Sequence, residues 1–217
     1  MKKTGIVVLT TAVMLTAATG VHAGPLGAAL TLQAGSLGFG VEVVKNVLPD
    51  LNARVGGNFF SYGLNQTNKD YDVQYDAKLR LQSFSLLADW HGLPGGFFLS
   101  AGAYINNNRI EASGVSTVDY TYGGSVYTPE DLGDLKVDVN FSKISPYVGL
   151  GLGNPVKEPG RIGFVLNVGT LYHNAPRVRV TATGMVEPTA EQQPDIENDV
   201  KDFRFFPVVS FGLSYSF

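Results

Sequence analysis

Several stretches of the chain alternate apolar side chains with small or polar ones, and single charged residues stand among the small or polar set. Glu42, for example, lies between Val41 and Val43. An isolated charge is expensive to bury, so opposite charges that face a narrow, dry interior are expected to pair. We expect an ion-pair network that fills the interior as a structural plug; the alternative is a selective polar conduit. Its predicted members are Glu42, Arg54, Lys78, Arg80, Asp89 and Lys143.

Catalytic and metal-binding residue patterns are scarce. After the N-terminal segment only His91 and His173 remain as histidines, and the sequence assigns neither of them a Ser or Asp partner. The chain has no G-x-S-x-G motif and no cluster with metal-ligand spacing. It has no cysteine, so disulfides and thiolate metal sites are excluded. We expect neither an enzyme nor a cofactor.

Two long polar segments, 114–139 and 184–202, are rich in acidic residues. A rim of carboxylates would attract cations and repel anions, although charge that merely keeps loops solvated is the simpler interpretation. Arg177 and Arg179 are expected to pair with these loops, or else to meet lipopolysaccharide phosphates. The predicted acidic rim consists of Asp119, Glu130, Asp131, Asp134, Glu187, Glu191, Asp195 and Glu197.

The N-terminus predicts export. Lys2 and Lys3 precede an apolar segment that ends in Val21-His22-Ala23, a small-x-small cleavage pattern. This arrangement is typical of a secretory signal peptide, here residues 1–23, followed by one mature domain over residues 24–217. Its removal leaves 14 basic against 19 acidic side chains and a formal net charge of −5, which disfavours nucleic acid as a partner.

Alternation of apolar with small or polar residues runs through the mature chain and predicts β-strands. No apolar run there reaches the roughly 18 residues of a transmembrane helix. A soluble sandwich would turn the apolar face inward, whereas a small membrane barrel turns it toward lipid. Gly149, Gly151 and Gly153 favour the barrel, because a crowded lumen needs small residues and a wet sheet face does not.

Short connections rich in Pro and Gly alternate with long polar ones, as periplasmic turns and extracellular loops do in outer-membrane barrels. Residues 28–34 supply the eighth strand that closure requires, joined by a tight type II′ turn at Gly35–Ser36. A change of phase near Gln82–Ser83 predicts a bulge, which leaves Lys78 and Arg80 facing the lumen. The other strands are predicted over residues 36–46, 51–63, 75–90, 96–111, 140–153, 161–182 and 203–217. The expected fold is all-β, an eight-stranded antiparallel up-and-down transmembrane barrel.

The C-terminal segment, FPVVSFGLSYSF, carries an apolar residue at alternate positions and ends on an aromatic ring. In a final strand that descends through the membrane, this row faces lipid. It resembles the C-terminal signal by which the barrel assembly machinery recognises outer-membrane proteins. Its residues are Val209, Phe211, Leu213, Tyr215 and Phe217.

The segments DWHGLPGGFFLSAG, SPYVGLGLGN and FFPVVSFGLSYSF, with the signal peptide and the strand pattern, resemble small Gram-negative outer-membrane barrels of the OmpW and CarO families. The short join between the first two strands is more similar to CarO. The resemblance implies a barrel in the outer membrane, where we expect contact with lipid and lipopolysaccharide. Small barrels are commonly monomers, so we also expect a monomer. The resemblance also implies a narrow porin-like barrel: CarO-like barrels are implicated in uptake of basic amino acids, and OmpW-like ones in passage of small hydrophobic compounds. The alternative is a non-transporting barrel that displays acidic loops to partners.

Overall fold

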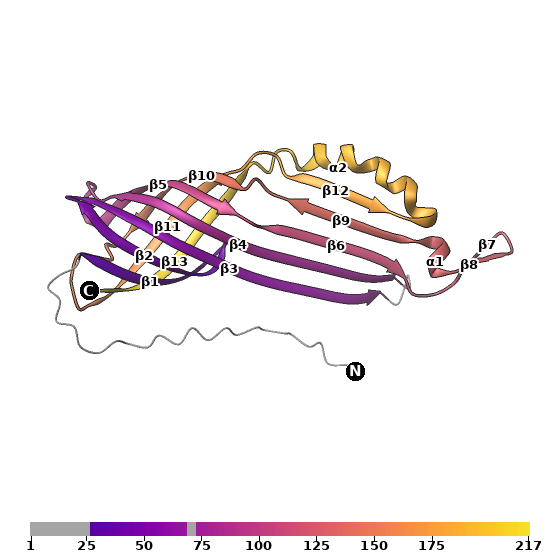
Figure 1. Ribbon diagram of the computed structural model, residues 1–217, viewed down its shortest axis with the longest axis horizontal. Coiled ribbons are helices and arrows are strands. Elements are labelled where there is room, and N and C mark those ends of the chain that lie inside the picture. The colour runs from indigo at the N-terminus through magenta and orange to yellow at the C-terminus, as the bar shows by residue number, and fades with distance from the viewer. Residues whose placement is uncertain (1–26, 69–72) are drawn as a thin grey trace.

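Eight antiparallel strand segments close into a barrel in this computed structural model, which describes residues 27–68 and 73–217 (Figure 1). The predicted signal peptide lies outside the described residues. Each strand pairs with the next, and the first pairs with the last. The predicted fold class is therefore confirmed. The barrel strands are β1 (Ala28–Gly35), β2 (Gly38–Leu48), β3 (Leu51–Asn68), β4 (Val73–Trp90), β5 (Phe97–Asn106), β10 (Ile144–Leu152), β11 (Ile162–Tyr172) and β13 (Phe205–Ser216).

A five-stranded sheet, here called the extension, projects from one end of the barrel (Figure 1). It contains the far halves of β3 and β4 together with β6 (Arg109–Ser116), β9 (Asp134–Asn140) and β12 (Arg177–Ala182). The strand order is β12-β9-β6-β4-β3. Two of the strands predicted as continuous are broken here, between β5 and β6 and between β11 and β12, and β9 forms in a segment predicted as a loop. The breaks lie where the closed wall opens into the sheet.

Short helices and one hairpin lie along the extension rather than on the barrel. The 3-10 segment η2 (Gly184–Gln192) and helix α2 (Gln193–Val200) lie against the free edge of β12. There the amides of Val178 and Val180 donate to side-chain oxygens of Glu197 and Gln193, over 3.3 and 3.1 Å. These bonds block an edge that could otherwise pair with another strand. The remaining elements are η1 (Pro94–Gly96), β7 (Tyr120–Tyr122), β8 (Ser125–Tyr127) and α1 (Pro129–Leu132). None of the helices in the described chain is both long and apolar enough to cross a membrane.

The barrel wall is apolar outside, whereas its inner face combines small and polar residues with one layer of large apolar side chains. Leu86 and Phe164 expose 63% and 70% of their surface, whereas the inward Ser85 and Ser100 expose 0% and 1%. This is the inverse of a soluble sandwich and is typical of a wall that meets hydrocarbon. The C-terminal row from Val209 to Phe217 points outward, as expected from its alternation.

The hairpin between β1 and β2 is as tight as the sequence suggested, but its turn differs. Gly35 pairs with Gly38, so the central residues are Ser36 and Leu37. Neither has a positive φ, so the type II′ prediction is wrong. The Ser36 hydroxyl donates to the carbonyl of Pro207, 3.0 Å away, which ties the turn to β13. Leu37 is thereby turned into the lumen, where it is buried.

The predicted bulge near Gln82–Ser83 is also wrong. The β3–β4 register runs without a shift from Leu51–Trp90 to Asn68–Val73. The backbone alternation is therefore constant, and Lys78 and Arg80 share the outer face with the lipid-facing residues of β4. The environment changes along β4. In the barrel the apolar residues of β4 are on the outer face, whereas in the extension they are on the inner face. The apolar positions therefore change phase in the sequence although the backbone contains no bulge.

The backbones of β4 and β5 lie so close together at Gly102 that only glycine fits there. A Cβ there would overlap the carbonyl oxygen of Leu86 and the Cα of Leu87 on the neighbouring strand. We predict that Gly102→Ala lowers the free energy of unfolding by about 2 kcal/mol, because backbone atoms must move apart. Urea unfolding in detergent micelles, followed through the single tryptophan, Trp90, measures this. Gly57→Ala is the control, since its Cβ would have no atom within 3.5 Å on the outer face. Equal stability of the two variants would contradict the packing argument.

Candidate functional site

The lumen is crossed by one arginine that contacts residues of four other strands. Arg54, on β3, donates through Nη1 to Glu42 Oε2 and to Asn167 Oδ1, both at 3.2 Å. Through Nη2 it donates to Asp89 Oδ1 at 3.1 Å and to Ser100 Oγ at 3.0 Å. These residues lie on β2, β11, β4 and β5, so a single guanidinium cross-links five of the eight strands. We call this group the arginine cluster.

The arginine cluster is almost fully buried and sets two carboxyl groups against one guanidinium. Glu42, Arg54 and Asp89 are each only 2–3% exposed. The second oxygen of Glu42, Oε1, accepts no hydrogen bond from the described residues. Removing one member of such a buried ion group is costly, because it leaves a charge without a counter-ion. The cluster is therefore a structural cross-link with an unsatisfied carboxylate oxygen at its edge.

Polar side chains seal the end of the lumen that carries the short turns. Asn52 contacts His91, with its Nδ2 atom 2.9 Å from His91 Nε2, and it accepts from Asn46 Nδ2 at 3.0 Å. The His91 ring lies 4.7 Å from the ring of Phe98. Burial lowers the pKa of His91 below its ordinary value, because the imidazolium loses hydration there. This layer favours a neutral imidazole.

An apolar layer fills the lumen on the extension side of the arginine cluster. The rings of Tyr104 and Tyr147 meet edge to face with centroids 5.5 Å apart. A Cβ at Gly149 or Gly169 would overlap the Tyr147 ring or hydroxyl, which explains why this face of the wall is rich in glycine. The layer, here called the tyrosine layer, consists of Leu37, Leu87, Tyr104, Tyr147, Leu171 and Val208.

Solved structures share this architecture. CarO and CarO2 of Acinetobacter baumannii each match with a TM-score of 0.56 and 18% sequence identity, over 89% of this chain and 98% of theirs. The chain has the CarO fold. No protein-family model matches it, and no curated protein matches it. At this identity the likeness establishes the fold alone, and the CarO-like architecture expected from the sequence is confirmed at that level.

The CarO-like barrel brings together three of the six charged residues predicted to form the lumen network, namely Glu42, Arg54 and Asp89. Lys78 and Arg80 are exposed on the outer face of the extension, so their predicted place in the lumen is wrong. Lys143 is exposed in the link between β9 and β10, so its predicted place in the lumen network is also wrong. Its backbone carbonyl accepts a hydrogen bond from the Asn106 amide.

Several lumen residues were missed because their types are unremarkable. Asn167 and Ser100 complete the arginine cluster, and Phe98, Tyr104 and Tyr147 fill the space around it. A sequence signal for the three aromatic residues exists: each stands in the small or polar phase of its strand. A large ring on that face indicates a side chain that reaches across the lumen.

The predicted acidic rim does not encircle the mouth of the CarO-like barrel. Its residues lie along the extension (Figure 1). Asp119 directly precedes β7, Glu130 and Asp131 lie in α1, Asp134 begins β9, and the other four lie in η2 and α2 beside β12. Two of the rim residues have structural roles. Asp131 accepts from the Thr128 amide and hydroxyl, which lowers its pKa, and Glu197 accepts from the Val178 amide. The prediction of a carboxylate ring is therefore corrected to a line of acids on one side.

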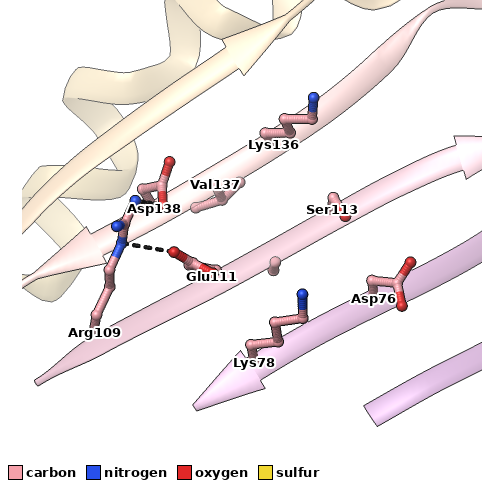
Figure 2. Close-up of a pocket in the computed structure, with 9 residues that line it drawn as sticks. Asp76, Lys78, Arg109, Glu111, Ser113, Lys136, Val137 and Asp138 are labelled. Atoms are coloured by element: carbon pink, nitrogen blue, oxygen red, sulfur yellow. Dashed lines mark hydrogen bonds and ion pairs between the residues drawn. The ribbon is translucent and has the colours of Figure 1, made fainter. Parts of the chain in front are cut away.

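A shallow hollow of about 280 Å³ lies on the outer face of the extension. Figure 2 shows its charged side chains standing on the same side of β4, β6 and β9. Arg109 lies 2.9 Å from Glu111 and 2.7 Å from Asp138, and the bond to Asp138 raises the Arg109 pKa further. The other polar residues that line it are Asp76, Lys78, Ser113 and Lys136.

Neither histidine forms a catalytic arrangement within the described chain. His173 is buried between the rings of Phe141 and Phe206. No side chain of Ser or Asp hydrogen-bonds either imidazole among the described residues. No group of three or more metal-ligating side chains is found in that part of the chain.

Arg54→Ala should lower the free energy of unfolding by about 3–5 kcal/mol, because Glu42 and Asp89 then remain buried without a counter-ion. The triple variant Arg54→Leu/Glu42→Gln/Asp89→Asn should recover more than half of that loss. Urea unfolding in micelles compares them. Arg161→Ala, which removes a largely exposed cation, serves as the control. If Arg54→Ala is no less stable than this control, the cross-link has no structural role.

His91 should make the barrel less stable in mild acid. The pKa of His91 in the folded protein lies below the unfolded value of about 6.5, so the unfolded state binds the proton more readily. The neutral imidazole therefore contributes to the free energy of unfolding above about pH 6.5, and this contribution is lost as the pH falls below that value. His91→Gln keeps a polar partner for Asn52 but does not titrate. We expect the difference in urea midpoint between the two proteins to shrink from pH 8 to pH 5.5. A difference that stays constant over this range would rule out titration of His91.

Proposed function

We propose that this protein is an outer-membrane barrel of a Gram-negative bacterium that is closed at rest and holds a rigid sheet at the cell surface. The apolar outer wall supports the membrane placement, together with the short turns at one barrel end and the long extension at the other. The predicted export signal at residues 1–23 supports the same placement. In this orientation the turn end faces the periplasm and the extension is extracellular.

The filled lumen carries the proposal of a closed barrel. Arg54 joins five strands across the lumen, and the tyrosine layer lies between the arginine cluster and the extension. An eight-stranded barrel is only wide enough for its own side chains, and here those side chains are in mutual contact. The surface that remains available to other molecules is the extension, which supports a role in interaction at the cell surface.

A second candidate function is slow uptake of small cationic solutes, such as basic amino acids. It is favoured by the second carboxyl group of the arginine cluster, because Oε1 of Glu42 accepts no hydrogen bond from the described residues. The ammonium or guanidinium group of a solute has the chemistry to replace the Arg54 head group at Glu42 and Asp89. The CarO-like architecture is compatible with this function. It requires Arg54 to swing aside and the tyrosine layer to open.

Planar-bilayer conductance tests the two functions directly. We predict that refolded wild-type protein gives no conductance steps, because the lumen is closed. Arg54→Ala/Tyr104→Ala/Tyr147→Ala should conduct, with a preference for cations because Glu42 and Asp89 remain. Arg161→Ala is the matched control, and heat-modifiable migration on gels verifies that every variant folds. Discrete cation-selective steps from the wild type, or liposome swelling in arginine, would instead establish the uptake function and overturn the closed barrel.

A further inference from the structure

Three arginines stand at one level on the outer face of the extension. Arg80 pairs with Arg109, Arg109 with Asn140, and Asn140 with Arg177. Directly paired residues share a face, and the unbroken β4 register makes this the face that meets lipid lower down. We call Arg80, Arg109 and Arg177 the arginine row. The next level away from the barrel contains Lys78, Glu111, Asp138 and Arg179.

The arginine row lies at the height where lipid head groups begin. Along β4, Trp90 marks the turn end and Arg80 lies ten positions away. At about 3.3 Å per residue and a tilt of about 40°, this is a rise of about 25 Å, the height of the apolar band in such barrels. The row is therefore placed at the outer boundary of the hydrocarbon.

The arginine row is electrostatically unbalanced. Arg109 is paired with Glu111 and Asp138, but Arg80, Arg177 and Arg179 form no ion pair with described residues, so the expected pairing of the last two with the acidic loops is not seen. Like charges directly opposite on neighbouring strands, as at Arg80 and Arg109, repel. The two levels together contain five basic and two acidic side chains on one face. The chain as a whole has a formal net charge of −3.

A second hollow, of about 360 Å³, lies on the same outer face at the upper end of the lipid-facing wall. Phe59, Phe84 and Ile105, which line it, expose 47%, 54% and 55% of their surface. Gln82 and Asn107 line it as well and contribute amide groups next to the arginine row. Apolar rings, then amides, then arginines follow one another away from the barrel. A phosphorylated glycolipid presents acyl chains, sugar hydroxyls and phosphate in that order.

We propose that the arginine row binds the phosphate groups of outer-leaflet glycolipid that lies against β3, β4 and β5. Guanidinium is suited to this role, because its planar donors match two phosphate oxygens at once. The phosphates supply the counter-charge that Arg80 and Arg177 lack within the described chain. The inference rests on the membrane placement proposed above but not on whether the lumen conducts.

Equilibrium binding of fluorescent bisphosphorylated lipid A to micelle-solubilised protein tests the inference. We expect Arg80→Gln/Arg177→Gln to weaken binding about tenfold, because two charged contacts to phosphate are lost. Lys157→Gln/Arg161→Gln removes the same charge from exposed positions at the turn end and should weaken binding less than about twofold. The wild type should bind dephosphorylated lipid A about as weakly as the arginine variant binds the phosphorylated lipid.

Three results would overturn the inference. Equal binding of the dephosphorylated lipid means that acyl chains alone are recognised, and an equal loss in the turn-end variant means that only total charge matters. Displacement by inorganic phosphate at lipid A concentrations means a site for free anions. The comparison of the two lipids on wild-type protein stands even if a variant misfolds. A protein that stays monomeric without detergent would overturn the membrane placement instead, and the conductance result bears on neither.

Discussion

A guanidinium buried inside the lumen constrains the whole barrel. Arg54 can remain charged in the lumen only if carboxylates face it, and Glu42 and Asp89 do so from the two strands beside β3. Their oxygens and the groups of Asn167 and Ser100 set how far apart the opposite walls can be. The glycines follow from the same lack of space, because rings that reach across the lumen occupy the volume where their Cβ atoms would lie. The side chains that fill the lumen are thus the same ones that hold the wall together.

β3 and β4 continue from the barrel into the extension, where the outer face of the strands meets water instead of lipid. Inside the membrane the outer face of β4 must be apolar, as at Phe84 and Leu86, while beyond it the same face carries Arg80 and Lys78. The inner face changes in the opposite sense, from Ser83 and Ser85 to Leu79 and Leu81. A continuous backbone therefore joins two environments of opposite polarity, and the arginine row stands at the boundary between them. This arrangement places a positive surface next to lipid in a protein whose net charge is negative.

The sequence predicted the barrel and the centre of its lumen, but not the members of the network at its upper end. Glu42, Arg54 and Asp89 lie in stretches with uninterrupted alternation, so their face could be inferred from phase alone. Lys78 and Arg80 could not, since the rule that apolar residues face outward holds only within the membrane, and the sequence does not mark where the membrane ends. The breaks that divide β5 from β6 and β11 from β12 fall at Asn107-Asn108 and at residues 173–176, where Asn and Pro disfavour a strand. The sequence therefore contained a local signal for both breaks that the period-two pattern alone does not use.

Alternation with period two and the absence of long apolar runs are local properties, so they could be identified from the sequence. Together with the requirement that a closed antiparallel barrel has an even number of strands, they were enough to specify an eight-stranded barrel with its apolar face outward. Tertiary structure alone decided which charges meet, that the acidic loops lie to one side of the mouth, and that arginines from β4, β6 and β12 stand at one level. Those outcomes depend on register and stagger between strands that are distant in the chain. A one-residue slip in register would turn a residue to the other face without changing any local pattern.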